Sequence, residues 1–323
     1  MKKLLFISLL FFLVLFSCKG KKPESNGEYS NLKIRIAQQF GMLFAPVYVV
    51  QELNLLDKYL PGVSSEWSNI SGGTTMNEAL VAGQLDVAFM GIPPLLIAWA
   101  RGVDFKIAGG ICVTPVELMV KENTIRSLSD FNDTDKIAVS GIGSINHIIL
   151  AMAAKRELGD AKAMDKNLIA MAHPDAYSAL LRGTEIKGHF TTMPYIDFEL
   201  KDGFISIVSA DEIYEQGNSI VCVTTKAFHD KQNEAYKGLI SALEEAIELI
   251  NNEDPEVISI ISKTEKISEE DAIRYLKWPG LLYDIKVYGT MGLARFMYEQ
   301  GFIDKAPEST ADIMWSGAVA VDE

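Results

Sequence analysis

The chain has 323 residues, a formal net charge of −13 and an apolar content of 48%. This acidic balance argues against a nucleic-acid partner, because proteins that bind nucleic acid carry basic patches, and against electrostatic docking on anionic lipid. The length exceeds what one compact core accommodates, and it predicts two domains or lobes.

The first residues predict export. Lys2 and Lys3 precede an apolar run of 13 residues, Leu4–Phe16, which only Ser8 interrupts. The run is shorter than the ~20 residues that span a bilayer, and it fits the apolar core of a secretory signal peptide. Residues Leu15–Cys18 resemble a bacterial lipobox. In a lipobox the thiol of the last residue, here Cys18, carries a diacylglyceryl group.

We therefore predict a signal peptide over residues 1–17 and a lipidated N-terminus with a polar tether over residues 18–31. Cleavage at Cys18 removes Lys2 and Lys3 and takes the formal charge from −13 to −15. A plain signal peptide with an incidental cysteine, or an uncleaved anchor, is the alternative. The prediction places the mature protein outside the cytoplasm, in the periplasm or at the cell surface, with Cys18 holding it to the membrane through lipid.

Strands and helices alternate through residues 32–115. The run Leu85–Met90 is apolar apart from Asp86, as in a strand that is buried on both faces. The alternation predicts a parallel sheet covered by helices on both sides. The predicted strands are Leu32–Gln38, Val63–Asn69, Leu85–Met90 and Phe105–Ile111. Two helices are predicted at Met42–Tyr59 and Leu95–Gly102. A third lies between them; Thr74 or Thr75 is predicted to cap its start, and it ends at Gly83.

Residues 116–218 repeat this pattern and predict a second lobe of like architecture. Its elements are a strand, glycine turn and helix at Lys136–Leu158, a strand at Asn167–Ala172, a helix at Pro174–Gly183, a strand and loop at Ile186–Tyr195 and a strand at Gly203–Ser209. Two stretches, Asn77–Pro94 and Tyr177–Tyr195, each carry an Ala-Leu pair shortly before a glycine and then run through a strand to a proline.

Residues 219–323 contain one strand followed by helices. The strand Ser219–Phe228 is predicted to return to the first lobe, and the helices Glu234–Asn252 and Tyr288–Ile303 to pack on it. Asp254 before a proline and Ser268 before Asp271 have the spacing of helix caps. Because this tail has no strand set of its own, we assign it to the first lobe.

Small and polar loops follow the carboxyl ends of the predicted strands, where open α/β sheets bind ligands. Several of them lead into helices, whose first N–H groups and dipole favour an anionic or polar group. The loops are Gln38–Leu43, Ile70–Thr75 and Met90–Pro94 in the first lobe, and Ser140–Asn146, Ala172–Ala176 and Thr191–Tyr195 in the second.

The sequence carries no recognisable catalytic or cofactor motif. The four histidines have no metal-ligand spacing, and Gly141–Asn146 lacks the second half of a dinucleotide loop. Cys112 and Cys222 lie in similar apolar strands, which favours two buried thiols over a disulfide between neighbouring strands. We therefore expect no metal, no cofactor and no catalytic residue.

The order and spacing of five stretches resemble the periplasmic solute-binding proteins of the nitrate, sulfonate and taurine type of ABC importer, a group that includes binders of thiamine precursors. The stretches are Ala45–Tyr59, Ser71–Pro94, Ser127–Leu150, Asp175–Tyr195 and Gly289–Ile303. The resemblance implies an α/β, bilobal type II periplasmic-binding-protein fold with two parallel-rich sheets flanked by helices. It implies two hinge strands near Cys112–Val120 and Ser219–Thr225, which connect a first lobe (32–115 and 219–323) to a second (116–218).

The resemblance also implies that a small solute is held between the lobes and handed to a membrane permease with its ATPase subunit. We expect the binding protein to be monomeric. Ser71 and Ser144 are expected to donate to oxygens of the ligand, and Phe40 and Tyr195 to form apolar walls. The implied binding residues are Gln39, Phe40, Ser71, Gly72, Thr74, Met90, Gly91, Gly141, Ser144, Asn146 and Tyr195.

One position departs from the family pattern. Relatives often carry a Trp-Glu-Pro-Tyr type of sequence at the last loop, whereas this chain has Thr191–Tyr195 with Met193 in place of the acid. Without that carboxylate an amine or aminopyrimidine is less favoured, and a sulfonate, another oxyanion or a neutral organic ligand is more favoured. Two alternatives are an enzyme on the same fold, which would use His147, His173 or His189, and a ligand sensor that docks on a receptor.

Overall fold

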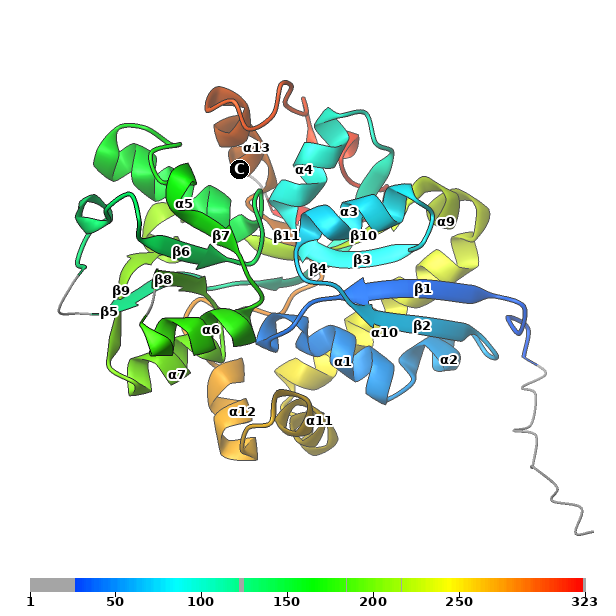
Figure 1. Cartoon of the computed structure of the whole chain (residues 1–323). Coiled ribbons are helices and arrows are strands. Elements are labelled where there is room, and N and C mark those ends of the chain that lie inside the picture. Colours follow the sequence, from blue (N-terminus) through cyan, green and yellow to red (C-terminus); the bar gives the residue numbers. More distant parts are fainter. Residues whose placement is uncertain (1–26, 122–124, 184, 216, 322–323) are drawn as a thin grey trace, which may run out of the picture.

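A computed structural model describes residues 27–121, 125–183, 185–215 and 217–321. The predicted signal peptide and Cys18 lie outside the described residues. Within the described ranges, no helix is both long and apolar enough to cross a bilayer. The chain forms two five-stranded sheets that lie side by side, with helices on both faces of each (Figure 1).

The first sheet has the strand order β2-β1-β3-β10-β4. Strand β1 runs parallel to β2 and β3, whereas β10 runs antiparallel to β3 and β4. Every residue of β3 is buried, as its apolar sequence predicts. The strands are β1 (Lys33–Gln38), β2 (Ser64–Asn69), β3 (Val87–Gly91), β4 (Phe105–Val113) and β10 (Ser219–Thr225).

The second sheet has the order β7-β6-β8-β5-β9 and the same mixed character. Strand β6 runs parallel to β7 and β8, and β5 runs antiparallel to β8 and β9. Its strands are β5 (Glu117–Lys121), β6 (Lys136–Val139), β7 (Leu168–Ala170), β8 (Ile186–Thr191) and β9 (Phe204–Ser209). A separate parallel pair joins β11 (Val287–Tyr288) to β12 (Ala320–Val321).

The helices divide between the two sheets. The first sheet and its helices are termed the first lobe, and the second sheet and its helices the second lobe. The first lobe carries α1 (Ala45–Glu52), α2 (Leu55–Tyr59), α3 (Gly73–Val81), α4 (Ile92–Ala100), α9 (Lys226–Lys231), α10 (Asn233–Asn251), α11 (Pro255–Glu265), α12 (Glu269–Leu276) and α13 (Thr290–Glu299). The second lobe carries α5 (Ile145–Leu158), α6 (His173–Arg182), α7 (Tyr195–Lys201) and α8 (Ala210–Ile213). Short 3-10 turns occupy Met42–Phe44, Leu128–Asp130, Asp165–Asn167 and Thr310–Asp312.

Side-chain caps mark the start of several helices. The predicted caps are confirmed, because Asp254 accepts hydrogen bonds from two N–H groups at the start of α11 and Ser268 accepts one at the start of α12. The prediction of one helix over Met42–Tyr59 was wrong. Asn54 adopts a left-handed conformation (φ 52°) that separates α1 from α2, a geometry that asparagine tolerates better than most residues.

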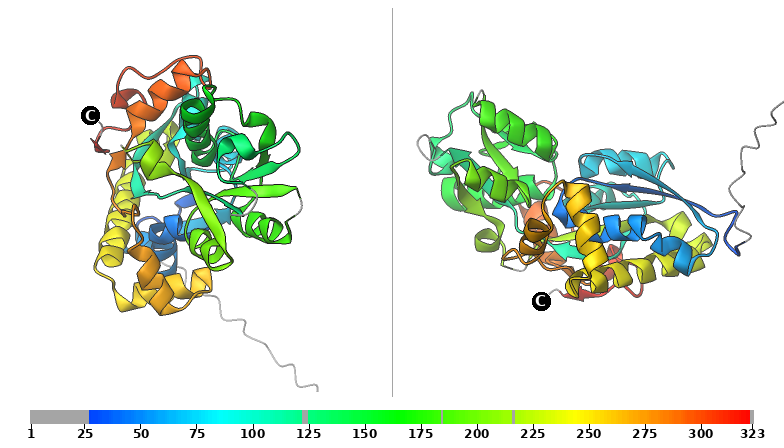
Figure 2. Two further views of the ribbon diagram at one scale, coloured as in Figure 1. Left: turned by 90° about the vertical axis from the view of Figure 1, so that its left-hand side faces the viewer. Right: turned by 90° about the horizontal axis from the view of Figure 1, so that it is seen from below.

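The apolar core is divided by sheet face. In Figure 1, α3, α4 and α5 lie above the two sheets, and α1, α2, α6 and α7 lie below them. One cluster of buried side chains gathers residues of α1, α6, α10 and α11, and the other gathers residues of α3, α4, α5 and α13. Both clusters contain residues from both sheets, so the apolar packing continues from one lobe to the other. Figure 2 shows the two lobes from two further directions.

The chain passes between the sheets at two connections, and these differ from the predicted hinge strands. Strand β4 ends at Val113 and β5 begins at Glu117, so the expected continuous strand over Cys112–Val120 is broken. Pro115 lies in the break and has no N–H to donate to a strand ladder. The second connection follows α8 of the second lobe and leads into β10, which belongs wholly to the first sheet.

Candidate functional site

A cavity lies between the lobes, at the carboxyl ends of strands from both sheets. The space open to the centre of a water molecule is about 40 Å³, which is room for only a few waters. Phe40 and Ser71 are exposed, so the cavity opens to solvent on their side. Of the eleven binding residues implied by the resemblance, six line it: Gln39, Phe40, Ser71, Gly91, Ser144 and Asn146.

Four helices begin at this cavity, at a lining residue or immediately after one. The first N–H groups of a helix have no partner within it, and the helix dipole adds positive potential there. Proline has no N–H, so α4, with Pro93 and Pro94, and α6, with Pro174, offer fewer free N–H groups than α3 and α5. Among the lining residues of the described chain, none is Lys, Arg, Asp or Glu. The potential in the cavity therefore comes from the backbone, an arrangement that suits a small anion. The helices and their first residues are α3 (Gly73), α4 (Ile92), α5 (Ile145) and α6 (His173).

Hydrogen bonds within the protein orient several polar lining groups. Gln39 accepts a hydrogen bond from the Gly72 N–H at 3.2 Å. Asn146 donates to the Phe190 carbonyl at 3.0 Å and accepts from the Ser140 hydroxyl at 2.8 Å. Ser144 caps α5, which leaves its hydroxyl hydrogen for an acceptor in the cavity.

Three predicted residues connect the lobes instead of lining the cavity. The Thr74 hydroxyl donates to the Ile142 carbonyl of the second lobe at 3.1 Å, and Gly72 takes the N-cap position of α3. The prediction that Thr74 or Thr75 caps this helix was therefore wrong. A Cβ on Gly141 would lie 3.5 Å from the Gly72 Cα, so glycines let the two backbones meet closely.

Two further predicted residues are placed elsewhere. Met90 is fully buried in the apolar core. Tyr195 is half-buried and does not line the cavity; its ring stacks on His173 with the centroids 5.8 Å apart. It begins α7, and its ring contacts His173 and Tyr177 of α6. Met193, where relatives carry an acid, is also fully buried.

Behind the cavity wall lies a hydrogen-bonded row of ionisable groups. His173 lines the cavity, and its Nδ1 lies 2.9 Å from Nε2 of His189. Nδ1 of His189 lies 2.6 Å from Oε1 of Glu199, and both of these side chains are fully buried. Burial raises the pKa of Glu199 and lowers the pKa values of His189 and His173, so each shift favours the neutral form.

The other residues that the sequence marks as candidates for chemistry have structural roles. His147 accepts a hydrogen bond from the Gly143 N–H and contacts Asp165, so it stabilises the loop before α5. Cys112 and Cys222 are buried free thiols, as the sequence favoured. Over the described ranges, no cluster of three metal-ligating side chains is present.

Sequence reasoning missed eleven lining residues. Most lie in or beside loops that the sequence marks as ligand-binding, so the loop signal was present. Val116 lies between β4 and β5, and Ile220 lies in β10; neither carries a local signal for ligand binding. The missed residues are Leu43, Phe44, Gly73, Pro94, Val116, Ser140, Ile145, Ala172, His173, Thr192 and Ile220.

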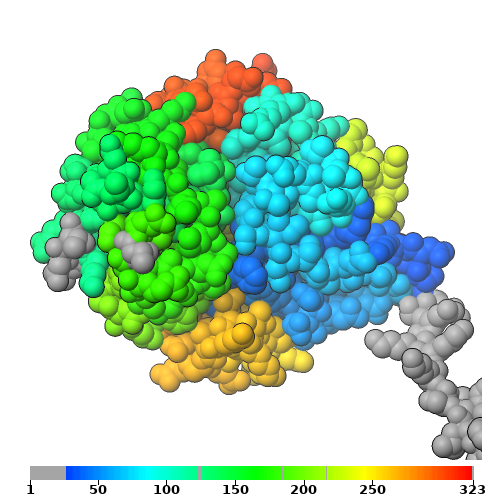
Figure 3. Space-filling view, in the orientation of Figure 1, coloured from blue at the N-terminus to red at the C-terminus, as the bar shows by residue number. Residues whose placement is uncertain are grey.

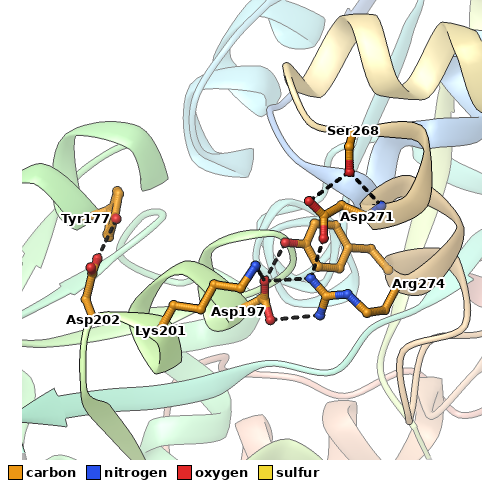
Figure 4. A network of polar contacts seen from close by, with 8 residues as sticks. Tyr177, Asp197, Lys201, Asp202, Ser268, Asp271 and Arg274 are labelled. Carbon is orange, nitrogen blue, oxygen red and sulfur yellow. Dashed lines mark hydrogen bonds and ion pairs between the residues drawn. The ribbon is translucent and has the colours of Figure 1, made fainter.

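The lobes meet along a seam in the space-filling view (Figure 3). Beyond the contacts at Thr74, an ion pair crosses from the second lobe to α12 of the first (Figure 4). Asp197 accepts two hydrogen bonds from Arg274, at 2.8 and 2.9 Å, and one from the Tyr275 hydroxyl at 2.5 Å. The Arg274 guanidinium holds the pKa of Asp197 well below its usual range.

The two mixed sheets and the cavity between them define the class of protein. This is the periplasmic-binding-protein fold. The alkanesulfonate-binding protein SsuA from Xanthomonas axonopodis pv. citri, solved with MOPS bound, aligns with a TM-score of 0.73 at 19% identity, over 88% of this chain and 98% of that one. The periplasmic nitrate-binding protein NrtA from Synechocystis PCC 6803 aligns with a TM-score of 0.70 at 14% identity, over 91% and 87% of the two chains.

Residues 30–264 match the NMT1-like family, and the chain belongs to it. The taurine-binding periplasmic protein of Escherichia coli (strain K12) is 26% identical over 248 residues, which is 73% of each chain. These findings confirm the resemblance to solute-binding proteins of ABC importers.

Proposed function

We propose that the protein is an extracytoplasmic solute-binding protein that captures a small oxyanion or sulfonate between its lobes. The observation that carries the proposal is the convergence of four helix N-termini on one cavity whose lining, within the described chain, has no charged Lys, Arg, Asp or Glu side chain. Backbone N–H groups and hydroxyls bind an anion there without a fixed counter-charge.

The names of the relatives support this choice of ligand class. One is a taurine-binding protein, one an alkanesulfonate-binding protein and one a nitrate-binding protein. A sulfonate and nitrate share a compact head of several oxygens and a low charge. The small cavity volume favours such a head, and a longer organic tail would leave past Phe40 and Ser71 at the exposed side.

A thermal-shift screen tests the ligand class. A ligand that binds only the folded protein, present at a hundred times its Kd, adds about 2.7 kcal/mol of stability, which raises the Tm of a chain of this size by roughly 5 °C. The panel is taurine, methanesulfonate, ethanesulfonate, nitrate, a pyrimidine and a flavin. We expect a shift with at least one of the first four. A shift only with the pyrimidine or the flavin would contradict the oxyanion assignment.

We further propose delivery of the solute to a membrane permease and its ATPase subunit by a monomeric protein anchored through lipid on Cys18. Residues 32–115 and 219–323 would move as one body against residues 116–218. Replacement of Cys18 by serine should abolish labelling with a radioactive fatty acid, and labelling that persists would end the anchor proposal. Loss of solute uptake on deletion of the gene tests the transport role against sensing.

We propose that no reaction takes place on the solute. The relatives compared above are named as binding proteins, and the histidines that an enzyme would use include only one, His173, on the cavity lining. Incubation with the ligand that binds, followed by mass spectrometry, should return it unchanged. Any product formed in proportion to the protein would favour an enzyme.

A further inference from the structure

Three side chains of the second lobe form a hydrogen-bonded row that ends at the cavity, here termed the histidine relay (Glu199, His189 and His173). The relay crosses three elements: Glu199 lies on α7, His189 on β8 and His173 at the start of α6. Its contacts are 2.6 Å from Glu199 to His189 and 2.9 Å from His189 to His173. Nδ1 of His173 is thereby occupied, and its Nε2 has no protein partner in the described part of the chain.

The relay couples its members because each nitrogen of a neutral imidazole is either a donor or an acceptor. With three protons in the relay, the Glu199 carboxyl donates to His189 Nδ1, His189 Nε2–H donates to His173 Nδ1, and His173 carries its proton on Nε2. The inner proton can also move to His189, which leaves Glu199 ionised, but the burial of both groups favours the neutral pair. Both arrangements leave His173 with an N–H that is free for the cavity.

In a third arrangement of the three protons, Nε2 of His173 would carry no proton, and the structure disfavours this arrangement. It requires the proton of Glu199 to sit on Oε2, which is buried and has no hydrogen-bond partner among the described residues. An unpaired buried hydroxyl donor costs about 1–3 kcal/mol, and native proteins tolerate it less well than an unpaired carbonyl oxygen.

Loss of one proton reverses the direction of the hydrogen bonds along the relay. His173 Nδ1–H then donates to His189, His189 Nδ1–H donates to the Glu199 carboxylate, and Nε2 of His173 becomes an acceptor. Burial, with a further contribution from the Asp202 charge, raises the pKa of Glu199 to about 9, so the three-proton form is the one present near neutral pH.

Several titratable groups surround the relay and contribute to its field. Tyr195 stacks on His173, and Tyr177 of α6 donates to Asp202 at 2.6 Å. The charges of Glu265 and Asp175 act on Tyr195. The acids add negative potential, which favours retention of the relay's third proton.

We propose that His173 donates its Nε2–H to an oxygen of the bound anion, and that His189 and Glu199 behind it keep the proton on that nitrogen. This inference rests on the proposed function, because it assigns a residue that selects oxyanions at the same site. An unprotonated nitrogen in that position would present a lone pair and repel an oxyanion. The relay therefore makes the cavity specific for ligands rich in hydrogen-bond acceptors at neutral pH.

Calorimetric titration between about pH 6 and about pH 10 tests the inference. The probes are methanesulfonate, ethanesulfonate and nitrate, whose charges do not change over this range. Wild-type affinity should be flat near neutrality and then fall by up to tenfold for each pH unit above the relay's pKa. Glu199→Gln cannot ionise, so its affinity should not show this fall.

His173→Phe should weaken binding about tenfold or more at neutral pH. His229→Phe is the matched control, because His229 stacks on Trp315 away from the cavity, and its affinity should equal that of the wild type. Melting curves establish that each variant is folded. Equal affinities for His173→Phe and the wild type, or parallel alkaline falls in the wild type and Glu199→Gln, would overturn the role of His173.

Nitrogen-15 NMR of the ligand-free protein separates this inference from the proposed function. Near neutral pH, His173 should be protonated on Nε2 in the wild type and in Glu199→Gln, and at about pH 10 the wild type alone should change to the Nδ1–H tautomer. A proton on Nδ1 at neutral pH overturns the relay even if anions bind. The expected tautomers without binding of any probe would instead overturn the proposed function, and with it the donation to a ligand.

Discussion

Replacement of Asp197 by asparagine tests whether the ion pair to α12 stabilises the closed lobes. The Asp197 side chain is 9% exposed, whereas that of Arg274 is 41% exposed. A hydrogen bond to a charged group contributes about 1.5–3 kcal/mol when buried, and solvent at Arg274 reduces that value. Asparagine keeps the shape but loses the charge and one acceptor oxygen, so we expect a loss of about 2 kcal/mol at neutral pH.

The pH dependence of that loss has a definite sign. The pKa of Asp197 is depressed in the folded protein, so the folded state favours the ionised carboxyl. The contribution is therefore fully present above the pKa of an unfolded aspartate, about 3.9, and it is lost as the pH falls through the lower folded value. The stability difference between wild type and Asp197→Asn should be constant from pH 7 to about pH 5 and should shrink below about pH 4.

Urea unfolding at several pH values measures this difference, with Asp271→Asn as the matched control. Asp271 contacts the same arginine at 2.6 Å but lies on the same helix, so its contact does not cross between the lobes. We expect the control to lose less than about 1 kcal/mol and to keep wild-type ligand affinity, while Asp197→Asn binds more weakly. Equal losses in both variants, or a loss in Asp197→Asn that is unchanged below pH 4, would refute the reasoning.

Three further predictions concern the cavity and the core. Gly91→Val should lower ligand affinity at least about tenfold, because even a Cβ there would lie 3.2 Å from the Ile145 Cβ of the opposite lobe; calorimetry that gives wild-type affinity would exclude a closed bound state of this geometry. Ser144→Ala should cost about 1 kcal/mol in urea unfolding through loss of the α5 cap, and an unchanged midpoint would contradict that role. Cys112 and Cys222 should resist a thiol reagent in the native protein and both react in denaturant, since burial raises the pKa of each; rapid native reaction would show that the core opens.

Much of the fold follows from patterns that are local in the sequence. Strand β3 is predicted because its apolar run sits between a glycine-terminated helix and a proline pair, and the structure buries every one of its residues. The loops after β1, β2, β3, β6, β7 and β8 are predicted to bind the ligand because parallel strands bring their carboxyl ends to one edge. The lining contains residues from all six loops.

Other features depend on tertiary packing, which the sequence pattern does not encode. Strand β10 pairs antiparallel with β3 and β4. Its apolar sequence is compatible with either parallel or antiparallel pairing, so the sequence does not predict its direction. The sequence cannot tell whether Gly72 approaches a ligand or the loop of the opposite lobe, because glycine serves either purpose. The contacts of His189 join residues 16 and 10 positions away in the chain, and no motif spacing marks them.

Calorimetric titration of the full panel of small anions, with recovery of the ligand afterwards, tests the central claim most directly. We expect at least one sulfonate or oxyanion to bind one molecule per chain and to be recovered chemically unchanged. Failure of every anion to bind, or conversion of the bound one to a product, would contradict a cavity that holds its solute through backbone N–H groups and hydroxyls without reaction.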